Sequence, residues 1–107
     1  MAIKLRTQRP DKLLKKIVSA LREYESLHPS ATIDVYRQNS LSVRIRVIDP
    51  QFRGQSRVER EEDIWQALYQ LPEETMAEVS FLLLLTPHET KDSVANAEFE
   101  NPRRSRL

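Results

Sequence analysis

The chain has no cysteine and only one glycine among its 107 residues. Without cysteine it has no thiol nucleophile, no disulfide framework and no thiolate zinc site, and it cannot hold an iron–sulfur cluster through its own sulfur atoms. One glycine cannot build the glycine-rich loops that cradle phosphates in nucleotide-binding proteins. These absences exclude several classes of enzyme and cofactor-binding protein.

Long apolar runs are also missing. No stretch approaches the roughly 20 apolar residues that cross a bilayer, and the N-terminus lacks the apolar core of a signal peptide. We therefore expect a soluble, cytoplasmic protein. Its length suits one domain, and the distribution of polar residues predicts a basic N-terminal arm over 1–10, a domain over 11–89 and a polar, flexible C-terminal tail over 90–107.

The formal net charge of +1 hides a strong separation of charge along the chain. Residues 1–22 carry seven basic side chains and one acidic one, and residues 37–60 hold six arginines. Residues 61–100 contain ten acidic side chains and a single lysine. Such a chain can attract an anionic partner with its basic part, or its two parts can neutralise each other in the fold.

Apolar spacing predicts two main helices. A stripe of apolar residues at three- and four-residue steps predicts a helix over 11–27, with Asp11 as its N-cap and His28-Pro29 as its end. Ser56 and Glu59 form a capping-box pattern that opens a second helix at about 57–71, followed by a helical turn at 72–76. The second helix is expected to bury Val58, Ile64, Trp65, Leu68 and Leu71.

Alternating apolar residues predict three strands. Residues 31–37 and 41–48 form a hairpin in which Arg37 opposes Leu41 and Asp34 opposes Arg44, because this register places both apolar sets on one face. Residues 79–85 form a third strand, parallel to the second because a helical crossover joins them. The expected fold is α+β, in the order α-β-β-α-(α)-β, with a three-stranded mixed sheet covered on one face by two helices.

The uncovered sheet face is the predicted binding surface. If Val79, Phe81, Leu83 and Leu85 face the helices, the other face presents a mixed apolar and cationic set: Tyr36, Arg44, Arg46, Leu82 and Leu84. That composition is common at the centres of protein interfaces. The alternative is that the C-terminal tail folds over this face.

The middle of the chain resembles the BolA family, which has a small KH-like α+β fold. The matching segments are Val47-Ile48-Asp49-Pro50-Gln51-Phe52-Arg53-Gly54, then Val58-Glu59-Arg60, then Leu85-Thr86-Pro87-His88-Glu89. The resemblance covers roughly residues 11–89. It implies a small non-enzymatic partner of monothiol glutaredoxins, which share an iron–sulfur cluster with BolA-like proteins, and some members of the family are reported to bind DNA.

The chain departs from that family where a metal ligand is needed. Glu61 stands where the family's second helix has histidine, Glu78-Val79 replaces His-Ala at the third strand, and the loop Gln38-Asn39-Ser40 offers neither cysteine nor histidine. Carboxylates and amides match iron–sulfur clusters poorly, so we expect no cofactor and no metal.

No catalytic set is evident in the sequence either. His28 and His88 are interpreted as surface residues, and the acids Glu61, Glu62 and Asp63 suit the start of a helix without any catalytic role. We therefore expect no enzymatic activity and no small-molecule substrate.

The predicted function is a non-enzymatic interaction module that binds a protein partner, or a second copy of itself, through the open sheet face. The first alternative is a sequence-nonspecific nucleic-acid binder with a regulatory role, which would contact phosphates through Lys12, Lys15, Lys16, Arg53 and Arg57. The second alternative is a BolA-like glutaredoxin partner, which the missing ligands disfavour. No membrane partner is indicated.

Overall fold

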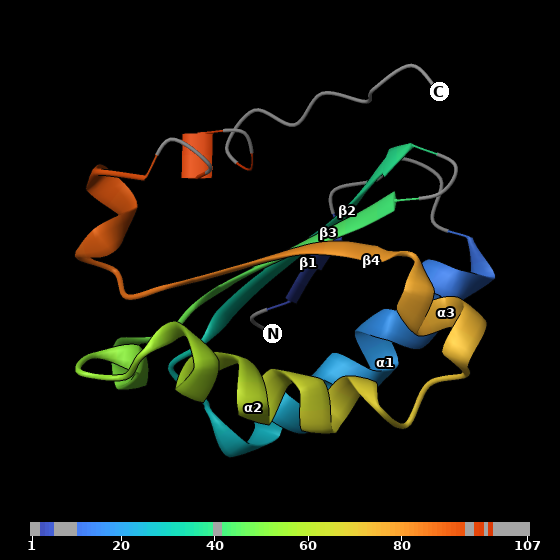
Figure 1. Cartoon of the computed structure of the whole chain (residues 1–107), viewed down its shortest axis with the longest axis horizontal. Coiled ribbons are helices and arrows are strands. Elements are labelled where there is room, and N and C mark those ends of the chain that lie inside the picture. The colour runs from blue at the N-terminus through green and yellow to red at the C-terminus, as the bar shows by residue number, and fades with distance from the viewer. Residues whose placement is uncertain (1–2, 6–10, 40–41, 94–95, 98, 100–107) are drawn as a thin grey trace.

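The computed structural model describes residues 3–5, 11–39, 42–93, 96, 97 and 99. The elements are β1 (Ile3–Leu5), α1 (Lys12–Leu27), β2 (Thr32–Asn39), β3 (Ser42–Ile48), η1 (Pro50–Phe52), α2 (Arg57–Leu68), α3 (Glu73–Ala77), β4 (Val79–Leu85) and η2 (Glu89–Lys91). From residue 11 onward this is the predicted order, so the α+β fold class is confirmed. Helices α1 and α2 lie on one side of the sheet (Figure 1).

The strands are ordered β1-β2-β3-β4, and the parallel pairing of β3 with β4 confirms the prediction for the third predicted strand. Strand β1 was not predicted. Its residues lie in the segment expected to be a basic arm, yet they pair in parallel with Ile33–Val35 of β2. Three alternating residues are too few to predict a strand. In the structure, Ile3 packs against the hydrophobic core.

Local signals set the helix boundaries. Asp11 accepts a hydrogen bond of 2.9 Å from the Leu14 N–H at the start of α1, and the capping box between Ser56 and Glu59 opens α2. Helix α2 ends at Leu68, three residues earlier than predicted. Val58, expected inside, is exposed, because it falls on a different side of the helix from the buried stripe. That stripe contains Ile64, Ala67 and Leu68.

The hairpin register differs from the prediction by two residues. Arg37 opposes Val43, and Asp34 opposes Arg46 instead of Arg44. A shift of two leaves every side chain on its predicted face, because strand faces alternate with a period of two. The observed register buries the Asp34–Arg46 pair, and an irregularity between Arg37 and Asn39 accommodates it.

In β4 the predicted faces are reversed. Val79 pairs with Val43, but the next paired residue is Phe81, opposite Arg44, so Ser80 is an extra residue in the ladder. A bulge of this kind inverts the alternation that follows it. Leu82 and Leu84 are therefore buried in the core, and the prediction that they lie on the uncovered face is wrong.

Candidate functional site

The sheet face opposite the helices is covered at its centre by residues near the C-terminus. Phe99 is 0% exposed, and its ring packs against Tyr36 at 5.1 Å and under the Arg46 guanidinium at 5.5 Å. Arg46 donates to Asn96 at 2.6 Å and, through Nε, to Asp34 at 3.0 Å. Asn96 and Phe99 therefore form a cover over this part of the sheet, made by the chain itself.

The prediction that the five open-face residues form one exposed surface is therefore wrong. Tyr36 and Arg46 are buried beneath the cover, and Leu82 and Leu84 belong to the core. Only Arg44 keeps partial exposure, with its guanidinium 5.2 Å from the centre of an aromatic ring of β4. The alternative, a C-terminal tail that folds over the sheet, agrees with the positions of Asn96 and Phe99. The remainder of the predicted tail, residues 94, 95, 98 and 100–107, lies outside the described part of the chain.

The five candidate phosphate-binding residues do not form one patch. The three lysines lie at the start of α1, next to the Asp11–Arg37 ion pair of 2.9 Å. The arginines follow η1 near the other end of the helix, where His28 contacts Gln51 at 2.8 Å. Helix α1, which has 16 residues and is about 24 Å long, runs between the two groups. The two groups are Lys12, Lys15 and Lys16 at one end, and Arg53 and Arg57 at the other.

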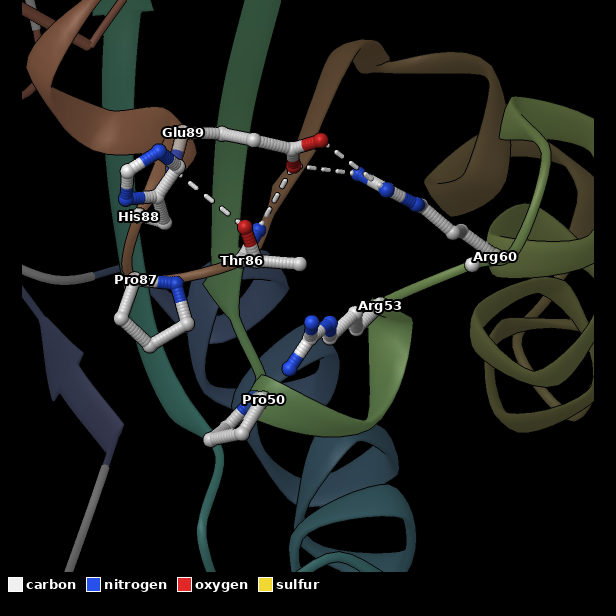
Figure 2. A pocket seen from close by; sticks show the side chains of 8 residues that line it. Pro50, Arg53, Arg60, Thr86, Pro87, His88 and Glu89 are labelled. Carbon is white, nitrogen blue, oxygen red and sulfur yellow. Dashed lines mark hydrogen bonds and ion pairs between the residues drawn. The ribbon is translucent and has the colours of Figure 1, made fainter.

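The three segments that carry the BolA resemblance meet around one cleft of about 570 Å³ (Figure 2). Arg60 of α2 reaches across it and holds the carboxylate of Glu89 with both terminal nitrogens, at 2.7 and 3.1 Å. The Arg60 guanidinium also stacks on Phe52. The cleft is lined by Pro50, Arg53, Gly54, Arg60, Thr86, Pro87, His88 and Glu89.

Glu89 has a second set of bonds that fixes the turn after β4. Its carboxylate accepts from the Thr86 N–H at 2.8 Å, and its own N–H donates to Thr86 Oγ1 at 3.2 Å. The hydrogen bonds from Arg60, followed by that from the Thr86 backbone, lower the pKa of Glu89 to about 2. The Arg60–Glu89 pair therefore clasps α2 to the end of β4.

A second buried network joins α1 to η1. Asp49 is fully buried and accepts hydrogen bonds from the Tyr24 hydroxyl and from the Gln51 N–H, both at 2.9 Å. Burial, followed by the bond to Asp49, raises the pKa of Tyr24. The His28 ring stacks on Tyr24 at 4.1 Å, so His28 is part of this network and not a plain surface residue. These contacts hold the end of α1 against η1, so these residues have a structural role.

Strand β4 ends the sheet, because no described strand pairs with its outer side. The Leu85 carbonyl accepts from the Asp49 N–H on the β3 side, whereas the Leu84 carbonyl accepts from Arg60 of α2. Since backbone groups alternate along a strand, Leu82 directs its N–H and C=O toward the outer edge. A cleft of about 330 Å³ follows this edge, lined by Gln55, Arg57, Arg60, Phe81, Leu82, Leu83, Leu84, Leu85 and Glu89.

The two ends of this edge carry opposite charges. Arg57 and Arg60 line the cleft where β4 ends, but Arg60 is paired with Glu89 and Arg57 lies 3.8 Å from Glu61. Arg53 is exposed and lines the neighbouring cleft together with Arg60. At the other end, Glu73 and Glu74 are exposed on α3, which leads directly into β4. The edge is therefore apolar along its length, with three arginines and two partly neutralising glutamates near its end and two exposed glutamates at its start.

The positions at which the BolA family has histidine do not fit an iron–sulfur cluster here. Glu78 pairs with Arg37 at 2.9 Å and Glu61 lies 3.8 Å from Arg57, so both carboxylates face guanidinium groups. In the described part of the chain, no group of three or more His, Asp or Glu side chains is placed to share a metal ion. Nor does any helix in that part have the length and apolar character to cross a bilayer.

Comparisons with known proteins identify no relative. No family model matches the chain, and neither a curated protein nor a solved structure matches it. The candidate site therefore depends on the geometry of the β4 edge.

Proposed function

We propose that this chain is a non-enzymatic interaction module that joins a second copy of itself by pairing two β4 strands in antiparallel orientation. The observation that carries the proposal is the β4 edge: seven residues, five of them Phe or Leu, with no described strand beyond it. An apolar edge strand is a template for another strand.

The distribution of charge supports a second copy as the partner. Antiparallel pairing of identical edges follows a two-fold axis, so each contact occurs twice and the assembly closes as a dimer. The axis places the acidic α3 end of one copy beside the arginine end of the other. A net charge of +1 per chain adds little repulsion between the copies.

The outward backbone groups of Leu82 suit this pairing, whereas the Leu84 carbonyl already accepts a hydrogen bond of 2.9 Å from Arg60 and has only its second lone pair left for the other copy. With Leu82 at the axis, its outward N–H and C=O exchange hydrogen bonds with those of Leu82 in the second copy. Ser80, which is exposed, then lies opposite Leu84 of the second copy. Helix layers fall on the same side of the extended sheet, because the axis is perpendicular to it.

Sedimentation equilibrium of Ser80→Lys tests the proposal. Lysine on an edge strand opposes strand pairing, so we expect the dimer dissociation constant to rise about tenfold or more, equivalent to about 1.4 kcal/mol. Ser26→Lys, the same change on the exposed face of α1, is the matched control and leaves self-association unchanged. A wild-type chain that stays monomeric, or equal self-association of the two variants, would overturn the proposal.

We also propose that the BolA resemblance reflects family membership. The three segments that carry it are far apart in the sequence but meet at the Arg60–Glu89 clasp. Their convergence supports a shared structural role for these residues. It carries no argument for a glutaredoxin partner or an iron–sulfur cluster.

A further inference from the structure

A second surface, which shares Glu73 with the acidic end of the β4 edge, lies between the end of α2 and α3. It is a shallow groove of about 310 Å³ lined by Trp65, Tyr69, Glu73, Met76 and Ala77. The Trp65 and Tyr69 rings stack with centres 5.9 Å apart and an interplanar angle of 26°. Tyr69 is 67% exposed, so much of its side chain is accessible from solvent.

The groove is negatively charged. Residues 61–78 contain six acidic side chains and no basic one, and two of the acids, Glu61 and Glu78, face arginines elsewhere. Glu73 lines the groove directly, and Glu62 is exposed one helical turn before Trp65 on the same side of α2. The C-terminal end of α2 adds the negative end of its helix dipole at Tyr69.

We propose that this groove binds an arginine or lysine side chain presented by a basic segment of a partner protein. Aromatic faces attract cations through the ring quadrupole, and an adjacent carboxylate adds a direct ion pair. The methylenes of the long side chain would lie on Met76 and Ala77 while the charged group reaches Glu73. Apolar lining, aromatic faces and negative charge together favour this occupant over an acidic or purely apolar one.

Trp65 is the single tryptophan of the chain, so its fluorescence reports directly on the groove. The probe is a peptide of alternating arginine and alanine, which has no fluorescence of its own, and the comparison peptide has glutamate in place of arginine. We expect a saturable change in Trp65 emission with the arginine peptide alone. Tyr69→Ala weakens binding about two- to fivefold, and Tyr69→Phe, which keeps the ring, restores it.

A matched pair of charge variants separates the groove from general attraction. Glu73→Gln removes the lining carboxylate, whereas Glu74→Gln removes the same charge from a neighbouring residue of α3 that does not line the groove. Weaker binding of Glu73→Gln than of Glu74→Gln supports the proposal. Equal effects of the two substitutions, or no saturable change in Trp65 emission, would overturn it; free methylguanidinium distinguishes recognition of the side chain alone from recognition of a peptide.

Discussion

At the scale of single residues, buried ion pairs and their neighbours decide which surfaces are available. Arg46 is satisfied by Asp34, Asn96 and the ring of Phe99, and all of these groups are buried. A buried guanidinium without partners would cost several kcal/mol. The cover over the sheet therefore completes the environment of Arg46, and it removes Tyr36 from the exposed surface.

Glu89 gives the chain a predictable dependence on pH. Its pKa is lowered from 4.5 to about 2, so the folded state favours the ionised carboxylate. The stability that comes from this group is complete above about pH 4.5 and is lost as the pH falls toward 2. Glu89→Gln removes that contribution, and the difference in unfolding free energy between wild type and variant therefore shrinks on acidification.

Urea denaturation at about pH 6 and about pH 2.5 measures this difference. Glu62→Gln, at an exposed carboxylate, is the control and shows a much smaller change between the two conditions. If the gap between wild type and Glu89→Gln is as large at the acidic pH as near neutrality, the clasp does not depend on ionised Glu89.

At the scale of elements, the sequence predicts what depends on local spacing. Helix α1 with its Asp11 cap and the Ser56–Glu59 capping box are confirmed, because each is decided by residues within one or two turns. The hairpin register is two residues off, since the apolar pattern alone allows any even shift. The observed register is the one that buries Asp34 against Arg46, and this burial depends on the whole fold.

In strand β4 a single bulge makes the prediction from alternating residues wrong. The run from Val79 to Leu85 has no polar alternation after Ser80 to show which side is buried. The extra residue at Ser80 then reverses the faces. The same reversal moves Leu82 and Leu84 from the predicted interface into the core, so this part of the candidate site was not predictable from the sequence.

The β4 assignment predicts opposite outcomes for neighbouring leucines. Leu82 is 7% exposed within the core, so Leu82→Ala is expected to lower the unfolding free energy by about 2–5 kcal/mol. Leu83 is on the opposite face and only partly buried, so Leu83→Ala costs less. Chemical denaturation of both variants measures the contrast, and a larger loss for Leu83→Ala would restore the face assignment that the sequence suggests.

At the scale of the whole molecule, folding brings the separated charges to particular places. The lysines of α1 and the arginines after η1 lie at opposite ends of the helix, so the basic residues do not merge into one surface. The acids of α3 and the arginines of α2 lie at the two ends of the β4 edge. The sequence shows that acidic and basic residues are separated along the chain. Only the topology shows that glutamates lie near the start of β4 and arginines near its end.

The short C-terminal segment also belongs to this scale. After Glu89 the sequence has only Val94 and Phe99 as large apolar residues before its last residue, Leu107. The structure places Phe99 on the sheet, where its ring contacts those of Tyr36 and Phe81. One aromatic residue in a polar segment is a weak pattern, so from the sequence a tail that folds over the sheet is only one of two alternatives.

Mixing two charge-reversed chains tests the central claim most directly. Arg53→Glu/Arg57→Glu makes both ends of the β4 edge acidic, and Glu73→Lys/Glu74→Lys makes both ends basic, so each variant alone is expected to self-associate about tenfold more weakly than wild type. In an antiparallel heterodimer every end meets its opposite, so sedimentation of the equimolar mixture should recover the wild-type dimer. A mixture that remains as dissociated as its two components would contradict the proposed pairing of β4 strands.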